Sequence, residues 1–114
     1  MEKLKDKDDK YIEYLSGEGI KAMNGSGLSA LLGVYVDKDN YKEFEKVVKK
    51  IVEKKCWNRI NDEIVNKLKD KGYEYDKYIE CVINEGIDAM DEFGLNALLG
   101  VCIYKDKYEG FEKV

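Results

Sequence analysis

One stretch of the chain carries a clear helical pattern of apolar and polar positions. In residues 41–55 the apolar side chains recur at spacings of three and four, and Lys and Glu fill most of the positions between them. The apolar positions are Phe44, Val47, Val48, Ile51 and Val52. This spacing places them on one stripe of a 3.6-residue helix. The pattern predicts an amphipathic helix over 41–55 that buries one face.

Shorter patterns of the same kind predict further helices, and polar or glycine-containing stretches separate them. We expect these helices over 10–17, 29–37, 63–71, 75–85 and 108–114. Ser29 and Asp62 are candidate N-caps, because a side-chain oxygen there can accept a hydrogen bond from a free backbone N–H. Asn24-Gly25 is a pair favoured in tight type I′ turns, so we expect 20–27 to be a turn. The predicted fold is all-α, with antiparallel helix pairs joined by turns.

The chain also repeats its own sequence. Gly-Leu-Ser-Ala-Leu-Leu-Gly-Val at 27–34 returns as Gly-Leu-Asn-Ala-Leu-Leu-Gly-Val at 94–101, 67 residues later. Around these stretches 17–47 aligns with 84–114 without a gap, and 19 of the 31 pairs are identical. Residues 10–13 recur as 77–80, and 3–7 recur as 67–71 after a three-residue gap. A fixed-period repeat indicates stacked units, so we divide a single domain, 1–114, into copies at 3–66 and 67–114.

Half of this period is close to the 33-residue length of an ankyrin repeat, and the junction between helices resembles that family. An ankyrin junction has a Gly-Ala-Asp-type helix end, a β-turn, and then Gly-x-Thr-Pro-Leu-His-x-Ala. Residues 86–88, Gly-Ile-Asp, match the first element, residues 96–101 stand at the second, and 19–34 repeat both. Ala replaces the Pro, Leu32 and Leu99 replace the His, and Val replaces the final Ala. The chain is similar to a degenerate, bacterial-type ankyrin-like array, which implies a helical repeat solenoid.

Both ends of this array fall within a repeat. Residues 108–114 match the start of 41–55 but stop at the counterpart of Val47. Residues 1–8 match the tail of a helix whose start has no counterpart, so we expect a frayed lead-in. Natural arrays carry polar capping repeats at their ends. We therefore expect a solenoid cut within a repeat at both ends, with self-association through the exposed ends as one outcome.

Charge and cysteine usage limit the classes of binding partner and the cellular compartment that we expect. The net charge of −4 is mild and both signs are interleaved, which predicts no nucleic-acid surface and no polybasic membrane patch. No secretory h-region and no apolar run of about 18 residues is visible. The three cysteines include no CxxC pair, and Cys81 and Cys102 align with Tyr14 and Tyr35 as packing residues. We expect a reduced, cytoplasmic protein, with secretion by a non-classical route left open.

No group of residues predicts catalysis or a bound cofactor. The chain has no His, the commonest general base and metal ligand. The acidic pairs at 8–9 and 91–92 lack the partners that acid–base chemistry needs. Residues 37–40 lack the Gly and Glu of a calcium loop, and Gly25-Ser26-Gly27 lacks the Lys of a phosphate loop. We expect no catalytic residue, no cofactor and no metal.

The resemblance to ankyrin repeats implies a protein–protein interaction module, which binds through its turn tips and short helices. The two copies agree in their helices and differ at the tips, where Asn24-Gly25-Ser26 faces Asp91-Glu92-Phe93 in the alignment. Trp57 and Phe93 are either packing aromatics or exposed interface anchors. The candidate partner-binding residues are Asn24, Ser26, Trp57, Arg59, Asp91, Glu92, Phe93 and Tyr104. The alternative is a purely structural segment, or a remnant of a longer array, with no binding surface of its own.

Overall fold

A computed structural model describes residues 19–114, and every regular element in this part of the chain is helical. The elements are the 3₁₀ turn η2 (Gly19–Ala22), α2 (Gly25–Asp37), α3 (Tyr41–Glu53), α4 (Arg59–Leu68), the 3₁₀ turn η3 (Tyr73–Tyr75), α5 (Asp76–Gly86), the 3₁₀ turn η4 (Ile87–Ala89), α6 (Glu92–Tyr104) and α7 (Tyr108–Lys113). The predicted all-α class is therefore confirmed for these residues. The predicted helix 10–17 and the lead-in 1–8 lie outside the described residues.

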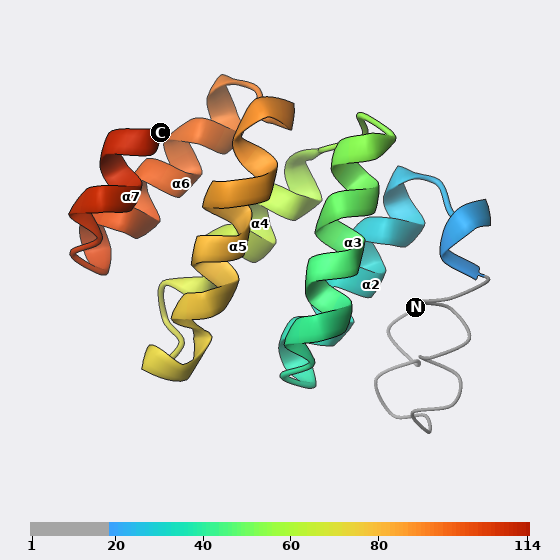
Figure 1. Ribbon diagram of the computed structural model, residues 1–114, viewed down its shortest axis with the longest axis horizontal. Helices are drawn as coiled ribbons and strands as arrows, with labels where there is room; N and C mark the ends of the chain where they lie inside the picture. Colours follow the sequence, from blue (N-terminus) through green and yellow to red (C-terminus); the bar gives the residue numbers. More distant parts are fainter. Residues whose placement is uncertain (1–18) are drawn as a thin grey trace.

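The helices lie in two layers (Figure 1). α2, α4 and α6 are side by side in one layer, and α3 and α5 lie with α7 in the other. The layers meet through the consecutive pairs α2–α3, α4–α5 and α6–α7. Each helix therefore packs mainly against the elements next to it in sequence or in its own layer.

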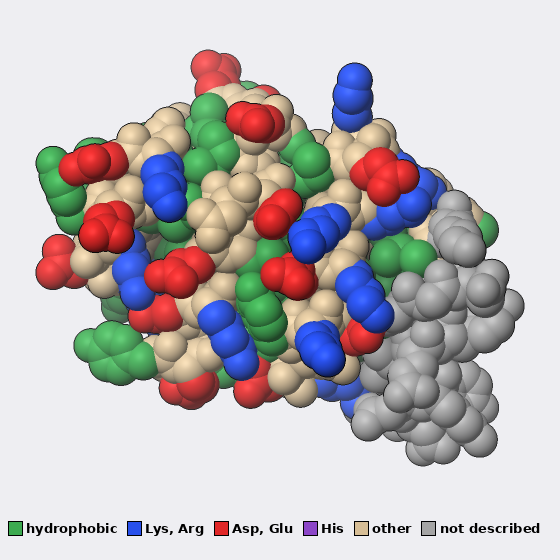
Figure 2. Space-filling view, viewed as in Figure 1, with side chains coloured by type: hydrophobic (Ala, Val, Ile, Leu, Met, Phe, Trp, Pro, Cys, Tyr) green, Lys and Arg blue, Asp and Glu red, His purple; other side chains and the backbone are tan. Residues whose placement is uncertain are grey.

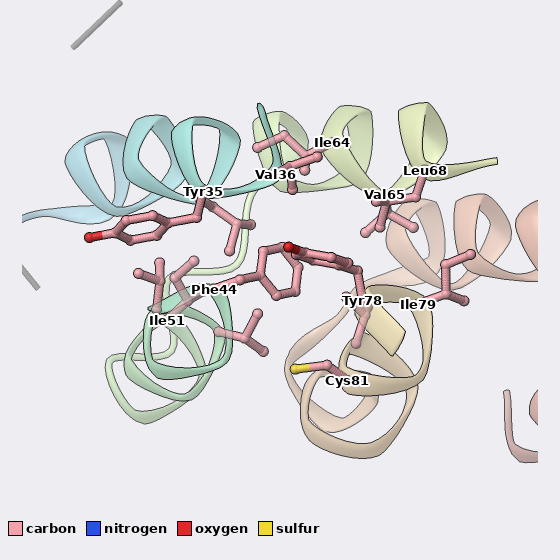
Figure 3. Close-up of a cluster of buried hydrophobic side chains, with 14 of the residues drawn as sticks. Tyr35, Val36, Phe44, Ile51, Ile64, Val65, Leu68, Tyr78, Ile79 and Cys81 are labelled. Atoms are coloured by element: carbon pink, nitrogen blue, oxygen red, sulfur yellow. The ribbon is translucent and has the colours of Figure 1, made fainter. Parts of the chain in front are cut away.

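The core lies between these two layers (Figure 3). Tyr35 and Val36 enter it from α2, and Phe44 and Ile51 enter it from α3. Four of the five positions in the predicted stripe of α3, Phe44, Val47, Val48 and Ile51, are fully buried, and the fifth, Val52, is half-buried against the core. The equivalent residues Leu31 and Leu98 of the two copies are also fully buried. The 3.6-residue period thus identified the face of α3 that meets the core.

The helices of the α2 layer begin earlier than predicted. The Asn24 side chain accepts the Gly27 N–H at 2.9 Å, and the Asp91 side chain accepts the Gly94 N–H at 3.0 Å. Asn58 does the same for α4, accepting from the N–H of Ile60 at 2.9 Å. The predicted N-caps Ser29 and Asp62 are therefore wrong, and the predicted turn over 20–27 is correct only as far as Asn24, because 25–27 belong to α2. Each cap satisfies a backbone N–H that the helix itself leaves free.

α2 and α6 end in the same turn. The N–H of Asn40 bonds to the carbonyl of Tyr35 at 2.9 Å, and that of Lys107 bonds to Cys102 at 2.8 Å. These six-to-one bonds define a Schellman motif, whose preceding residue adopts a left-handed backbone. That residue is Asp39 with φ of 52° in the first copy and Asp106 with φ of 56° in the second. The two copies therefore share backbone geometry at both ends of the helix.

The cysteines belong to the packing, as predicted for Cys81 and Cys102. Both are buried and free, and Cys56 is half-buried and free. Burial raises the pKa of the Cys81 and Cys102 thiols above the usual value. Both thiols are therefore protonated at neutral pH. The protonated form is a poor nucleophile and a poor metal ligand.

Candidate functional site

The N-termini of α2, α4 and α6 lie along one edge of the molecule. The Ser29 hydroxyl on α2 is 3.2 Å from Oδ1 of Asn58, which caps α4. On the other side of α4, Asp62 Oδ1 is 2.9 Å from the position that a Cβ would take at Gly94 on α6. These contacts align the first turns of the three helices. We call the exposed residues of this edge the N-terminal row: Asn24, Ser26, Arg59, Ile60, Asp91, Glu92 and Phe93.

The row brings together six of the eight predicted binding residues. They are not loop tips, however, since Asn24 and Asp91 are N-caps and the others lie in first helical turns. The equivalent second helical positions carry Ser26, Ile60 and Phe93. Ile60 is 46% exposed and Phe93 is 61% exposed. The same backbone position thus displays a small polar, an aliphatic and an aromatic side chain.

Ile60 is the member of the row that sequence reasoning missed. A helix that begins after Asp62, as the sequence predicts, leaves Ile60 outside α4. Its spacing from the cap Asn58 equals the spacing of Phe93 from the cap Asp91. That equal spacing is the signal that could have identified it.

Trp57 is half-buried and packs next to the row, between α4 and the end of α5. Its Nε1–H donates to Asp62 Oδ1 at 2.7 Å, and its ring lies near Gly86 at the end of α5. Burial raises the pKa of Asp62, the bond from Trp57 lowers it, and the net pKa lies above the usual value. A side chain at Gly94 would meet Asp62 and Met90, so glycine permits the close approach of α4 and α6. Trp57 therefore helps to fix the spacing of the row's helices.

Tyr104 lies apart from the row. It is the last residue of α6, at the opposite end of that helix, and is 66% exposed. The Lys69 ammonium lies 5.9 Å from the centre of its ring. The eight predicted residues therefore divide into six members of the row, Trp57 behind them, and Tyr104 on another side.

A cluster of ion pairs links the α6–α7 turn to the start of α5. The Asp76 carboxylate forms ion pairs with Lys105 at 3.3 Å and with Lys107 at 2.9 Å, and Lys105 also donates to the Lys71 carbonyl. Burial would raise the pKa of Asp76, but the bonds from Lys107 and Lys105 outweigh it and hold the pKa below its usual value. The hydrogen bond that Lys107 donates to Asp76 raises the pKa of Lys107. The two groups therefore stabilise each other as ions.

The remaining surface carries alternating charges and open hollows. Acidic and basic side chains alternate over the face that Figure 2 shows, which includes α3 and α5. A hollow of about 570 Å³ lies between α5 and α7, beside Glu80, Ile83 and Tyr108. Among residues 19–114, no three His, Cys, Asp or Glu side chains are grouped so that they could hold a metal ion. None of the helices described in this range has the length and apolar character needed to cross a membrane.

Comparison with protein-family models, with curated proteins and with solved structures finds no match.

Proposed function

We propose that this chain is a protein–protein interaction module built as an ankyrin-like helical repeat, without catalytic activity of its own. Three features support the repeat. The caps Asn24, Asn58 and Asp91 recur at 34 and 33 residues, the helices pair consecutively, and the pairs pack in order along the molecule. Units that contact mainly their neighbours are characteristic of solenoid proteins.

The observation that carries the proposed function is the N-terminal row. Three helices with equivalent caps place different side chains at the same exposed position, Ser26, Ile60 and Phe93. Large apolar side chains contribute strongly to binding when a partner covers them. A rigid scaffold that varies only its contact positions can recognise a specific protein surface.

The dimensions of the row indicate the kind of partner segment it fits. Neighbouring helices pack about 8–10 Å apart, so the row extends over about 20 Å. An extended chain advances about 3.3 Å per residue, so about six residues would follow the row. Arg59 at its centre and Asp91 and Glu92 at one end give it both charges. We propose that the row binds an extended protein segment of mixed charge with apolar side chains over Ile60 and Phe93.

The test is the double substitution Ile60→Ser and Phe93→Ser in the full chain. Partner capture from a cell lysate should fall at least tenfold, because two apolar anchors are removed. The melting temperature should stay close to that of the unmodified protein, since exposed substitutions usually change stability by about 0.5 kcal/mol or less each.

The matched control is Ile103→Ser, which removes an even more exposed aliphatic side chain from α6 outside the row. This control should retain capture. If the double variant captures the same proteins as the control, the row does not carry recognition and the proposal is wrong.

One observation favours the alternative of a purely structural segment. The outer side of α6 and α7 exposes Ile103, Tyr108 and Phe111, whose counterparts in the first copy are largely covered. A segment that serves only to stack would keep such a face and would tolerate any polar change in the row. The same pair of variants separates the two functions, because a structural segment loses nothing when Ile60 and Phe93 are replaced.

A further inference from the structure

The face at the α6–α7 end of the molecule is apolar and uncovered. Ile103 is 67% exposed, Tyr108 is 68% exposed and Phe111 is 40% exposed. Together with Cys102, Asp106 and Lys107 they line a hollow of about 210 Å³. We call these three apolar residues and Asp106 the end face. It is separate from the N-terminal row, because it lies at the C-terminal end of α6.

The first copy shows how the equivalent face is covered. Val36, Tyr41 and Phe44 align with Ile103, Tyr108 and Phe111, and the pair α4–α5 packs over them. Val36 is only 4% exposed and Phe44 is fully buried. Ile64 of α4 comes within 3.7 Å of a Cβ placed at Gly33, whereas no such atom lies within 4 Å of one at the equivalent Gly100. The covering is therefore supplied by the next helix pair.

Tyr78 of α5 makes the central contacts of that covering. Its ring meets Tyr41 and Phe44 edge-on, at centroid distances of 5.3 and 4.8 Å. Its hydroxyl donates to the Asp39 carboxylate at 2.7 Å. The Lys77 ammonium lies 5.4 Å from the centre of the Tyr41 ring. A Lys-Tyr pair on α5 thus contacts two rings of α3 and one carboxylate of the turn between α2 and α3.

The end face presents the same groups. Asp106 aligns with Asp39, and both have the left-handed backbone of the Schellman turn. Tyr108 and Phe111 follow Asp106 at the spacings by which Tyr41 and Phe44 follow Asp39. The end face therefore fits a helix that presents a Lys-Tyr pair and apolar neighbours.

The first segment of this chain has that sequence. Lys10-Tyr11-Ile12-Glu13 repeats Lys77-Tyr78-Ile79-Glu80, and Leu4 aligns with Leu68, which is fully buried in the core. The segment cannot reach the end face of its own chain. Tyr11 is eight residues from Gly19, a span of at most about 28 Å, whereas the long axis measures 38 Å and η2 and α7 lie at its two ends (Figure 1).

We propose that the end face binds the first segment, residues 3–17, of a second copy of this chain, with the Tyr11 hydroxyl donating to the Asp106 carboxylate. Lys10 of the second copy then lies over Tyr108, as Lys77 lies over Tyr41. The contact is heterologous, because the first segment of one copy meets the last helices of the next. Such a contact does not close on itself in a pair, so copies add head to tail.

The experiment measures self-association of the full chain by analytical ultracentrifugation. Concentrations up to about 1 mM detect a Kd in the millimolar range or tighter. The unmodified chain should show an average mass that rises with concentration beyond that of a dimer. Ile103→Glu places a charge on the end face and should weaken association at least tenfold. Ile60→Glu, the same substitution at an exposed isoleucine of the N-terminal row, should leave association unchanged.

Mixing two variants tests the direction of the contact. Tyr11→Ala disables the segment and keeps the end face, whereas Ile103→Glu disables the end face and keeps the segment. Each alone should be monomeric, and an equimolar mixture should form a one-to-one pair that grows no further. Tyr11→Phe, which removes only the hydroxyl, provides a second variant if Tyr11→Ala loses helical circular dichroism, and it should weaken association several-fold.

Three results would overturn the proposal. The first is a monomer at every concentration. The second is association that Ile103→Glu leaves intact. The third is association that Ile103→Glu abolishes and Tyr11→Ala leaves intact, which would indicate a symmetric contact between two end faces. None of these results bears on recognition through the N-terminal row, which is read from partner capture.

Discussion

The pairs α2–α3 and α6–α7 have closely similar sequences and nearly the same local structure, yet their surroundings differ. Both begin with a capped first turn and both join their helices by a Schellman turn. In the first pair, Val36 and Phe44 are buried because α4 and α5 cover them. In the second pair, the equivalent Ile103 and Phe111 are exposed.

This difference separates the structure that a helix pair forms by itself from the burial that the next pair provides. Caps, turns and helix lengths are fixed within the pair, since they depend on residues close in sequence. Burial of the outer face depends on the following pair. Apolar burial contributes about 25 cal/mol per Å², so the same sequence is less stabilised at the end than beside α4–α5.

The largest expected effect comes from the paired core leucines. Leu31→Ala and Leu98→Ala should each lower the free energy of unfolding by about 2–5 kcal/mol, because each removes a fully buried side chain. Leu31→Ala should cost more, since helices that are packed on both sides collapse less readily around a cavity. Urea denaturation of the two variants measures this. Equal losses would show that the end pair is as tightly constrained as the first.

The second effect concerns the ion pairs that hold the end pair in place. Asp76→Asn should lower stability at pH 7 by about 2–3 kcal/mol, because it leaves the buried Lys105 without its charged partner. The pKa of Asp76 is depressed in the folded state, so its contribution is complete above its unfolded pKa of about 3.9 and disappears as pH falls through the lower folded value. Denaturation between pH 7 and pH 2 should therefore show the variant and the parent converging in acid.

The third effect tests the aromatic contact between the first pair and α5. Tyr78→Phe should lower stability by about 1–2 kcal/mol, because it removes a part-buried hydrogen bond to the charged Asp39 carboxylate while the ring contacts remain. The control is Tyr108→Phe, at an exposed tyrosine of the end pair, which should change stability by less than about 0.5 kcal/mol. Thermal melting of both variants is the measurement. Equal shifts would mean that the hydroxyl bond contributes nothing.

The smallest effect separates the two left-handed aspartates. Asp106→Gly should raise stability by about 1 kcal/mol, because glycine adopts positive φ without the Cβ penalty. Asp39→Gly gains the same relief but loses the bond from Tyr78, so its net change should be zero or negative. Chemical denaturation of both resolves the difference. A stabilised Asp39→Gly would contradict the importance of the Tyr78 contact.

Sequence analysis located helices better than it located their starts. The stripe of α3 was correct because four core positions share one face, and no other period fits them. The starts of α2 and α4 were misplaced by four residues because each has two polar residues that could cap it. Ser29 is instead buried within α2, where its hydroxyl donates to the Gly25 carbonyl at 2.9 Å. The choice between two possible caps depends on packing between helices, which the local sequence does not contain.

The candidate surface was predicted only in part, because some of its residues are positioned by packing between helices. Asn24 and Phe93 were found because the copies differ there, and Arg59 was found because it lies in a stretch predicted as a turn. Ile60 was missed with the start of α4, and the packing of Trp57 against Asp62 depends on a tertiary contact. The end face follows from a comparison of burial between copies, which needs coordinates.

The layered packing also has a consequence for the rate of folding. Since the main contacts join helices that are next to each other or one helix apart in the chain, little loop entropy is lost before the first contacts form, and such chains fold in microseconds to milliseconds. The α4–α5 pair contacts both of the others, so structure that forms there can extend in either direction. The chain has no proline whose isomerisation could slow the process. Stopped-flow refolding should therefore show one fast phase and no phase lasting seconds.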